Sequence, residues 1–263
     1  MHPAEWRLIN GEFLEALPAE LARARGNAVA RALAGSDWLL RRKSDGKFLA
    51  LRRGDVVREL QRGALTPNLQ SDLLELASAD ALGESPRPLS GLVERLHELG
   101  LDEVNYGERS GLVLVPEPNT LAYAGRDRYA RPLWLAHATA NSWKCIRAAA
   151  MRDGIVLDAI SGYRSHDYQL GIFRRKLARG QTVEEILVVN AAPGFSEHHS
   201  GSALDIGTPG EPAAEESFEL TPAFAWLRRH AGEFGFVMSY PRGNHHGITY
   251  EPWHWRHASF ANA

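Results

Sequence analysis

The strongest constraint on the fold of this 263-residue chain comes from two short segments that lie far apart in the sequence. The first, Ser-Glu-His-His-Ser-Gly-Ser-Ala-Leu-Asp, occupies residues 196–205, and the second, Glu-Pro-Trp-His, occupies residues 251–254. Together they supply the imidazoles and carboxylates that a catalytic zinc site needs, namely three protein ligands, an open position for water and a nearby base. We therefore expect a fold in which these segments meet, and a metal-dependent hydrolase.

The spacing within the first segment requires a bend. His198 and Asp205 are seven residues apart, and in an uninterrupted strand an odd separation places two side chains on opposite faces. Gly201, between two serines, permits a tight bend that reorients the chain. The motif is thus expected to be a ligand, a bend and then a second ligand on a strand.

The second segment predicts a ligand held by two indoles. On a strand, Trp253 and Trp255 share one face and His254 points to the other, so the indoles anchor the strand and direct the imidazole toward a cleft. Glu251 precedes His254 by three residues, and Pro252 disturbs the strand between them. Glu251 is therefore expected beside the metal's water rather than on the metal.

These patterns predict His198, Asp205 and His254 as the metal ligands. His199 and the pair at 245–246 lack the same context, and we expect them to be supporting or surface groups, although His199 is easily confused with the ligand beside it.

A third motif, Ser-Gly-Tyr-Arg-Ser at 161–165, directly follows the apolar stretch 155–160. Arg164 would present its planar donors at the end of a strand, in a geometry that suits a carboxylate. Gln169, one turn into the following helix, could donate a further hydrogen bond. The alternative is that Arg164 forms a structural salt bridge with an acid such as Asp167.

Apolar spacing and turn residues predict the elements. Helices are expected within 12–34, near 55–62, 68–79 and 89–99, over 136–152, and after Ser165 and Thr221; Asp45-Gly46 predicts a β-hairpin, and Pro116 to Asn119 a linker. The expected fold class is α+β, with a small antiparallel sheet and flanking helices in a catalytic domain at 116–263. A separate, mostly helical accessory region with a hairpin would occupy residues 1–115.

Composition limits the partners. The 30 basic and 32 acidic residues nearly cancel, which argues against a nucleic-acid partner, and no apolar run is long enough to span a membrane. The N-terminal residues show no export signal, so we expect a cytoplasmic location, with a periplasmic location or secretion by another route as the alternative. The single Cys145 excludes an internal disulfide and is expected to be a small buried side chain.

The three motifs together resemble the zinc D-alanyl-D-alanine carboxypeptidases of the vancomycin-resistance type, a group that includes L,D-carboxypeptidases and some phage endolysins. The resemblance spans roughly residues 120–258. It implies one zinc ion held by His198, Asp205 and His254, with Glu251 as the catalytic base. It also implies that Arg164, Gln169 and Ser196 contact the substrate, which would be a peptidoglycan stem peptide or muropeptide.

Several functional alternatives remain open. A carboxylate held by Arg164 favours removal of a C-terminal D-alanine, but D,D- and L,D-cleavage are not separated by sequence, nor is the oligomeric state. A peptidoglycan endopeptidase of endolysin or secreted-effector type is one alternative, and a non-catalytic zinc-containing module that binds wall peptides is another. Such a module would have no need of Glu251.

Two other peptidase classes fit poorly. Ser44 and Lys47 match the Ser-x-x-Lys motif of serine peptidases of the penicillin-binding type, but they lie on the predicted hairpin turn and no Lys-Thr-Gly follows. His97-Glu98 begins a thermolysin-like motif, but Leu101 stands where the second histidine is required.

Overall fold

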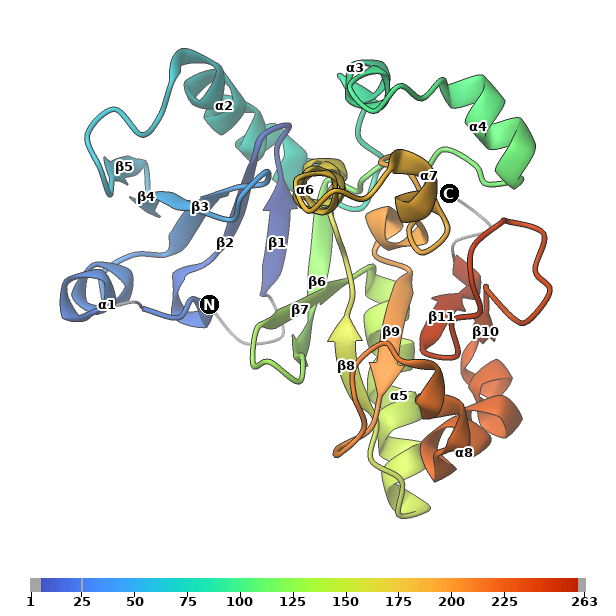
Figure 1. Ribbon diagram of the computed structural model, residues 1–263. Coiled ribbons are helices and arrows are strands. Elements are labelled where there is room, and N and C mark those ends of the chain that lie inside the picture. The colour runs from blue at the N-terminus through green and yellow to red at the C-terminus, as the bar shows by residue number, and fades with distance from the viewer. Residues whose placement is uncertain (1–5, 25, 260–263) are drawn as a thin grey trace.

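The structure is a computed structural model that describes residues 6–24 and 26–259. Two antiparallel sheets lie side by side, with helices around them (Figure 1). Residues 1–5, on which the expectation about an export signal depends, lie outside the described residues. No helix among the described residues is both long and apolar enough to cross a membrane.

The first sheet has seven strands in the order β5-β4-β3-β2-β1-β6-β7, and every neighbouring pair is antiparallel. Its strands are β1 (Arg7–Asn10), β2 (Leu14–Pro18), β3 (Trp38–Arg42), β4 (Phe48–Arg53), β5 (Val56–Glu59), β6 (Thr120–Arg126) and β7 (Pro132–Leu135). The predicted hairpin is confirmed as β3 and β4, and Gly46 in its turn has a φ of 68°.

In the N-terminal region, the helix prediction for residues 12–34 is wrong in its first part, and the helix predicted near 55–62 is wrong. Residues 14–18 form the strand β2, which is buried along its whole length, so it lacks the alternation that marks a half-exposed strand. A helix in the predicted 12–34 stretch occurs only later, as α1 (Asn27–Ala34), after the short 3₁₀ helix η2 (Ala19–Leu21). The residues near 55–62 form the edge strand β5 instead of a helix. The hairpin is thus one part of a larger sheet.

Three further helices precede residue 116, namely α2 (Pro67–Ala81), α3 (Leu92–His97) and α4 (Glu103–Ser110). The first confirms the helix predicted at 68–79, and it packs on β1 and β2. Buried residues of α3 and α4 share a core with α6 and α7, which come later in the chain. Because β1 also pairs with β6, contacts cross residue 116 at several places, and the division into two domains remains a prediction.

The second sheet has four antiparallel strands in the order β10-β11-β9-β8. These strands are β8 (Asp158–Ser161), β9 (Ala203–Gly207), β10 (Phe236–Met238) and β11 (His254–His257). The α-helices of this part are α5 (His137–Arg152), α6 (His166–Leu177), α7 (Val183–Leu187) and α8 (Pro222–His230), and the 3₁₀ helices are η3 (Glu197–Ser200), η4 (Glu216–Leu220) and η5 (Ala231–Phe234). A small antiparallel sheet with flanking helices is the arrangement predicted for this part.

One core joins the two sheets. Leu133 and Leu135 of β7 pack in the same buried cluster as Trp143 and Ile146 of α5 and Leu204 of β9.

The helix α5 confirms the prediction for 136–152. Cys145, on the opposite face of that helix, is exposed, so its predicted burial is wrong.

Candidate metal centre

Strand register brings the two motifs together. β9 and β11 are antiparallel neighbours, and His254 lies directly opposite Asp205 while Trp255 lies opposite Leu204. Directly opposed residues in an antiparallel pair project to the same face of the sheet. Trp255 and Leu204 enter the core on one face, so His254 and Asp205 meet on the other.

The bend expected at Gly201 is present, and it places His198 beside this pair. His198 lies in η3, and Gly201 ends that turn with a φ of 72°. A Cβ atom at this position would lie 2.4 Å from the side chain of Leu121 and 2.8 Å from the backbone nitrogen of Ala136. Positive φ and close packing together require glycine here.

The three predicted ligands form a buried cluster. Potential ligand atoms of His198, Asp205 and His254 all lie within 4.8 Å of one another. Asp205 Oδ1 is 3.3 Å from His198 Nε2 and 3.2 Å from His254 Nδ1. Two atoms bound to one tetrahedral zinc ion lie roughly 3.3 Å apart, given the usual bond lengths. The spacing and the N/O donor set therefore fit zinc.

Each imidazole is fixed by a hydrogen bond from the nitrogen that faces away from the cluster. The Nδ1–H of His198 donates to the carbonyl of Gly162 at 2.7 Å, and its Nε2 is buried without a hydrogen-bond partner in the described part of the chain. The Nε2–H of His254 donates to Glu197 Oε2 at 2.8 Å, and the Nδ1–H of the protonated ring donates to Asp205 Oδ1 at 3.2 Å. A ligating histidine is usually fixed through its other nitrogen in this way.

Glu197 is a candidate site residue that the sequence did not point to. Its buried carboxylate also accepts a hydrogen bond from Ser239 Oγ at 2.6 Å and lies 3.1 Å from Arg256 Nε. It therefore orients His254 from the side away from the cluster. The sequence offers only a weak sign of this role, namely that Glu197 directly precedes the ligand His198. A glutamate at such a position in a short turn is commonly exposed.

The protonation states of the three predicted ligands depend on one another. Burial opposes ionisation of Asp205, but the two imidazoles outweigh it and hold the pKa of its carboxyl far below the ordinary value. Burial lowers the pKa of His198 to about 4. Burial also disfavours a charged His254, but hydrogen bonds to Asp205 and Glu197 prevail and raise its pKa to about 10. A metal that binds Nδ1 of His254 must therefore displace a proton.

Glu251 lies beside the cluster and outside the strand. It precedes β11, as expected from Pro252, and its Oε2 is 3.9 Å from His254 Nδ1. Burial raises the pKa of Glu251 to about 7, with the carboxylates of Asp205 and Glu197 adding to the effect. A carboxyl group with a pKa near neutrality can both accept and return a proton.

Arg164 lies in the same cavity as the cluster. The cavity has a volume of about 280 Å³, and its lining includes Arg164 together with His198, Asp205, Glu251 and His254. Arg164 Nη2 is 4.0 Å from Asp205 Oδ2, and Arg164 Nε is buried without a hydrogen-bond partner among the described residues. A guanidinium with a buried, unused donor is suited to an anionic ligand.

The salt bridge of Arg164 with Asp167, offered as an alternative, is wrong, because Asp167 pairs with Arg95 at 2.7 Å.

Gln169 and Ser196 also line this cavity. Gln169 donates from Nε2 to the carbonyl of Ala191 at 2.9 Å, and its buried Oε1 has no partner among the described residues. The unused atom of Gln169 is therefore an acceptor, whereas the sequence predicted a donor. Ser196 is buried and directly precedes η3.

The other histidines considered from the sequence, His199 and the pair at 245–246, lie outside the cluster. His199 is buried, and its Nδ1–H donates to the carbonyl of Arg164 at 2.6 Å, so it supports the segment that carries that arginine. The His245 and His246 rings contact each other, and His246 Nδ1 lies 2.8 Å from the carbonyl of Ser110.

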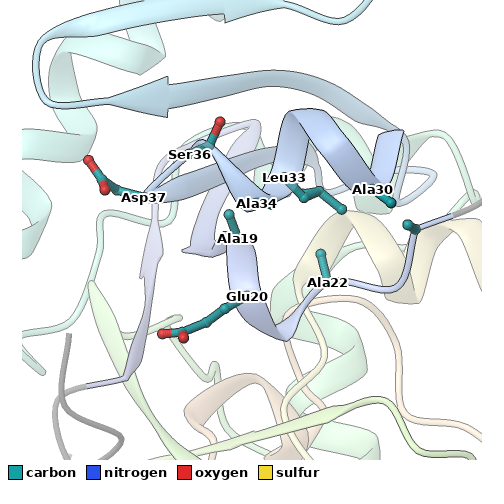
Figure 2. A pocket seen from close by; sticks show the side chains of 9 residues that line it. Ala19, Glu20, Ala22, Ala30, Leu33, Ala34, Ser36 and Asp37 are labelled. Atoms are coloured by element: carbon teal, nitrogen blue, oxygen red, sulfur yellow. The ribbon is translucent and has the colours of Figure 1, made fainter. Parts of the chain in front are cut away.

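A larger cavity, about 420 Å³, lies by α1 and is lined mostly by alanines (Figure 2). Its titratable lining residues among those described are Glu20 and Asp37, and it contains no histidine or cysteine. Such a lining offers no set of metal ligands, so volume alone does not identify the site.

Comparison with known proteins gives a family for this part of the chain. Residues 132–260 match the family model VanY, D-alanyl-D-alanine carboxypeptidase. The chain is 33% identical over 184 residues to the putative carboxypeptidase YodJ of Bacillus subtilis, a match that covers 66% of this chain and 61% of YodJ. It is 31% identical over 125 residues to a D-alanyl-D-alanine carboxypeptidase of Enterococcus faecalis, with 44% of this chain and 45% of that protein covered.

Among solved structures, the LdcB LD-carboxypeptidase is 33% identical, with a TM-score of 0.44, and the match covers 48% of this chain and 59% of LdcB. The matched part of this chain spans less than two thirds of YodJ and less than half of the E. faecalis enzyme. The region that contains the histidine and aspartate cluster, residues 132–260, belongs to the VanY family of D-alanyl-D-alanine carboxypeptidases.

Proposed function

We propose that this protein is a zinc-dependent carboxypeptidase that removes a C-terminal D-amino acid from peptidoglycan stem peptides. The observation that carries the proposal is the convergence of His198, Asp205 and His254 with inward-facing ligand atoms, beside a carboxyl group of raised pKa. The family match and the names of the curated relatives support the same class of substrate.

The three ligands would hold zinc, which supplies a Lewis acid that polarises the scissile carbonyl and makes water nucleophilic near neutral pH. Glu251 accepts the proton of the attacking water, because it lies next to the cluster and titrates near neutrality. The same carboxyl then returns the proton to the departing amine. Glu197 keeps the His254 ring oriented during these steps.

Arg164 explains why the enzyme would act at a chain end. Its side chain lies in the cavity of the cluster, with Nε buried and unused. A free C-terminal carboxylate can pair with this guanidinium, whereas an internal peptide bond offers no such anion. We therefore assign Arg164 to the terminal carboxylate of the substrate.

The test is hydrolysis of a pentapeptide ending in D-Ala-D-Ala and of the tetrapeptide that remains after loss of one D-Ala. Mass spectrometry of the products would show release of D-alanine from one or both, abolished by a chelator and restored by zinc. Product from the pentapeptide alone means D,D-cleavage, and product from the tetrapeptide alone means L,D-cleavage. Cleavage at internal bonds only, or activity that survives chelation, would contradict the proposal.

Arg164→Ala tests the carboxylate assignment. Loss of one charge-assisted hydrogen bond should lower kcat/KM by about 10- to 100-fold. A matched control is Arg174→Ala, since Arg174 is an exposed arginine paired with Glu98 on the surface. On a peptide whose C-terminus is amidated, Arg164→Ala and the wild type should be equally slow. If Arg164→Ala cleaved the free-acid peptide as well as the wild type, the assignment would be wrong.

A further inference from the structure

The segment that carries Arg164 is held by a buried ion pair that lies outside the family region. Glu117, between α4 and β6, accepts hydrogen bonds from the hydroxyl of Tyr163 and from the backbone N–H of His166, each at 2.7 Å. These two residues flank Arg164 on either side. One carboxylate therefore fixes the chain both before and after the arginine.

The charge of Glu117 is balanced from the N-terminal sheet. Lys43, between β3 and β4, forms an ion pair with Glu117 Oε2, and its Nζ also donates to the carbonyl of Gly11 at 2.9 Å. The two side chains are only 3% and 6% exposed, so each charge depends on the other. Burial disfavours the ionised Glu117, but Lys43 and His166 outweigh it, and the pKa of Glu117 lies well below its ordinary value.

Imidazoles extend this network to the backbone of Arg164. His166 Nε2 lies 2.8 Å from the carbonyl of Val115, and the His166 ring meets the His199 ring edge to face at 4.4 Å. The Nδ1–H of His199 donates to the carbonyl of Arg164, while its Nε2 accepts from the N–H of Gly194 at 3.1 Å. Arg164 is thus held through its own carbonyl as well as through its neighbours.

We propose that Lys43 and Glu117 are positioning residues for Arg164, so that the N-terminal sheet is a working part of the substrate site. The proposal rests on the proposed function, in which Arg164 binds the substrate's terminal carboxylate. It gives residues 1–115 a role: they supply the buried cation that allows Glu117 to stay ionised and hold the segment from Tyr163 to His166.

The primary experiment compares Lys43→Met with Lys47→Met, a control that removes a 71% exposed lysine from the same hairpin. Steady-state kinetics on the D-Ala-terminated peptide should show KM raised about tenfold for Lys43→Met, with kcat nearly unchanged, because ground-state and transition-state binding are lost together. Zinc content and the visible spectrum of the cobalt-substituted protein should match the wild type. Lys47→Met should behave as the wild type throughout.

Amide hydrogen exchange of the segment 163–166 provides a readout that needs no activity. The N–H of His166 donates to Glu117, so its exchange should accelerate at least severalfold in Lys43→Met and remain unchanged in Lys47→Met. If the wild type cleaved no D-Ala-terminated peptide, the proposed function would fail, and this exchange would still decide whether the ion pair orders the segment.

Two further variants apply if Lys43→Met does not fold. Tyr163→Phe removes one hydroxyl from the network, and Lys43→Met combined with Glu117→Gln removes both charges while keeping an oxygen that can accept from His166. Both should raise KM and accelerate exchange, less than Lys43→Met would. The proposal is overturned if these variants lose stability but keep wild-type KM and wild-type exchange of the segment 163–166.

Discussion

Two buried carboxylates, Asp205 and Glu117, lie at the centres of two polar clusters, and the clusters differ in completeness. Both oxygens of Glu117 have donors within the protein, from Lys43, Tyr163 and His166. Around Asp205, by contrast, His198 Nε2 and Arg164 Nε are buried without a hydrogen-bond partner in the described part of the chain.

A buried polar atom without a partner costs about 1–3 kcal/mol. In the proposed function, zinc and the substrate's carboxylate would supply partners for these two atoms. The complete cluster instead holds the incomplete one in place.

The largest expected effect is on chemistry at the incomplete cluster. Glu251→Gln removes the proton acceptor and should lower kcat by about 10²- to 10⁴-fold. Zinc content, measured by elemental analysis, should stay near one ion per chain, because Glu251 is not assigned as a ligand. The control is Glu184→Gln, on the exposed face of α7. Normal turnover by Glu251→Gln would remove Glu251 from the mechanism.

For the complete cluster, around Glu117, the largest expected effect of a substitution is on the free energy of unfolding. Lys43→Met leaves the carboxylate of Glu117 buried without its cation, and breaking a buried pair in this way costs about 3–5 kcal/mol. Denaturant unfolding would measure the change, with Lys47→Met as the control. A loss below about 1 kcal/mol, typical of surface pairs, would mean that the pair is not a structural centre.

Glu197→Gln should have a smaller effect on metal binding. The amide can no longer accept from Nε2 of His254 with a full negative charge, so zinc affinity should fall by about 10- to 100-fold. Competition with a chromophoric chelator would measure it. Affinity equal to the wild type would show that Ser239 and Arg256, rather than His254, are the partners that matter to Glu197.

The smallest expected effect is on the pH dependence of stability. One carboxyl group from each cluster should change it, and the two changes should have opposite signs. The pKa of Glu117 is lowered, so its contribution to stability is present above its ordinary value of 4.5 and is lost as the pH falls below that value. The pKa of Glu251 is raised to about 7, so in metal-free protein stability decreases as the pH rises from 4.5 to 7.

Unfolding curves of metal-free protein across pH 3–8 test both signs. Glu117→Gln should flatten the acidic side, and Glu251→Gln the side between pH 4.5 and 7. If both substitutions changed the same side of the profile, the contrast between the clusters would be wrong.

Sequence reasoning predicted the three side chains because spacing constrained each one within its own segment, and the family resemblance joined the two segments. The seven-residue spacing of His198 and Asp205 demanded a bend, Gly201 offered one, and the indoles around His254 fixed its direction. Glu197 was missed, because its partner His254 is 57 residues away and pairing between β9 and β11 cannot be read from spacing.

The N-terminal fold was predicted less well for related reasons. β2 is buried on both faces, so Leu14 and Leu17 carry no alternation and their spacing resembles that of a helix. The pairing of Arg7 with Ala122 joins residues more than a hundred positions apart, and no local pattern announces it. Glu117 lies in a segment read as a linker, although its side chain is a buried centre.

The register between β6 and β7 has a consequence for how this protein can be divided. The family match begins at Pro132, the first residue of β7, while β6, its hydrogen-bonded neighbour, lies outside the match and pairs in turn with β1. A protein cut at residue 132 would leave β7 as an open edge and remove the N-terminal residues against which the buried Trp134 packs. The stretch of sequence that matches the family model is thus shorter than the stretch joined by the strands of this sheet.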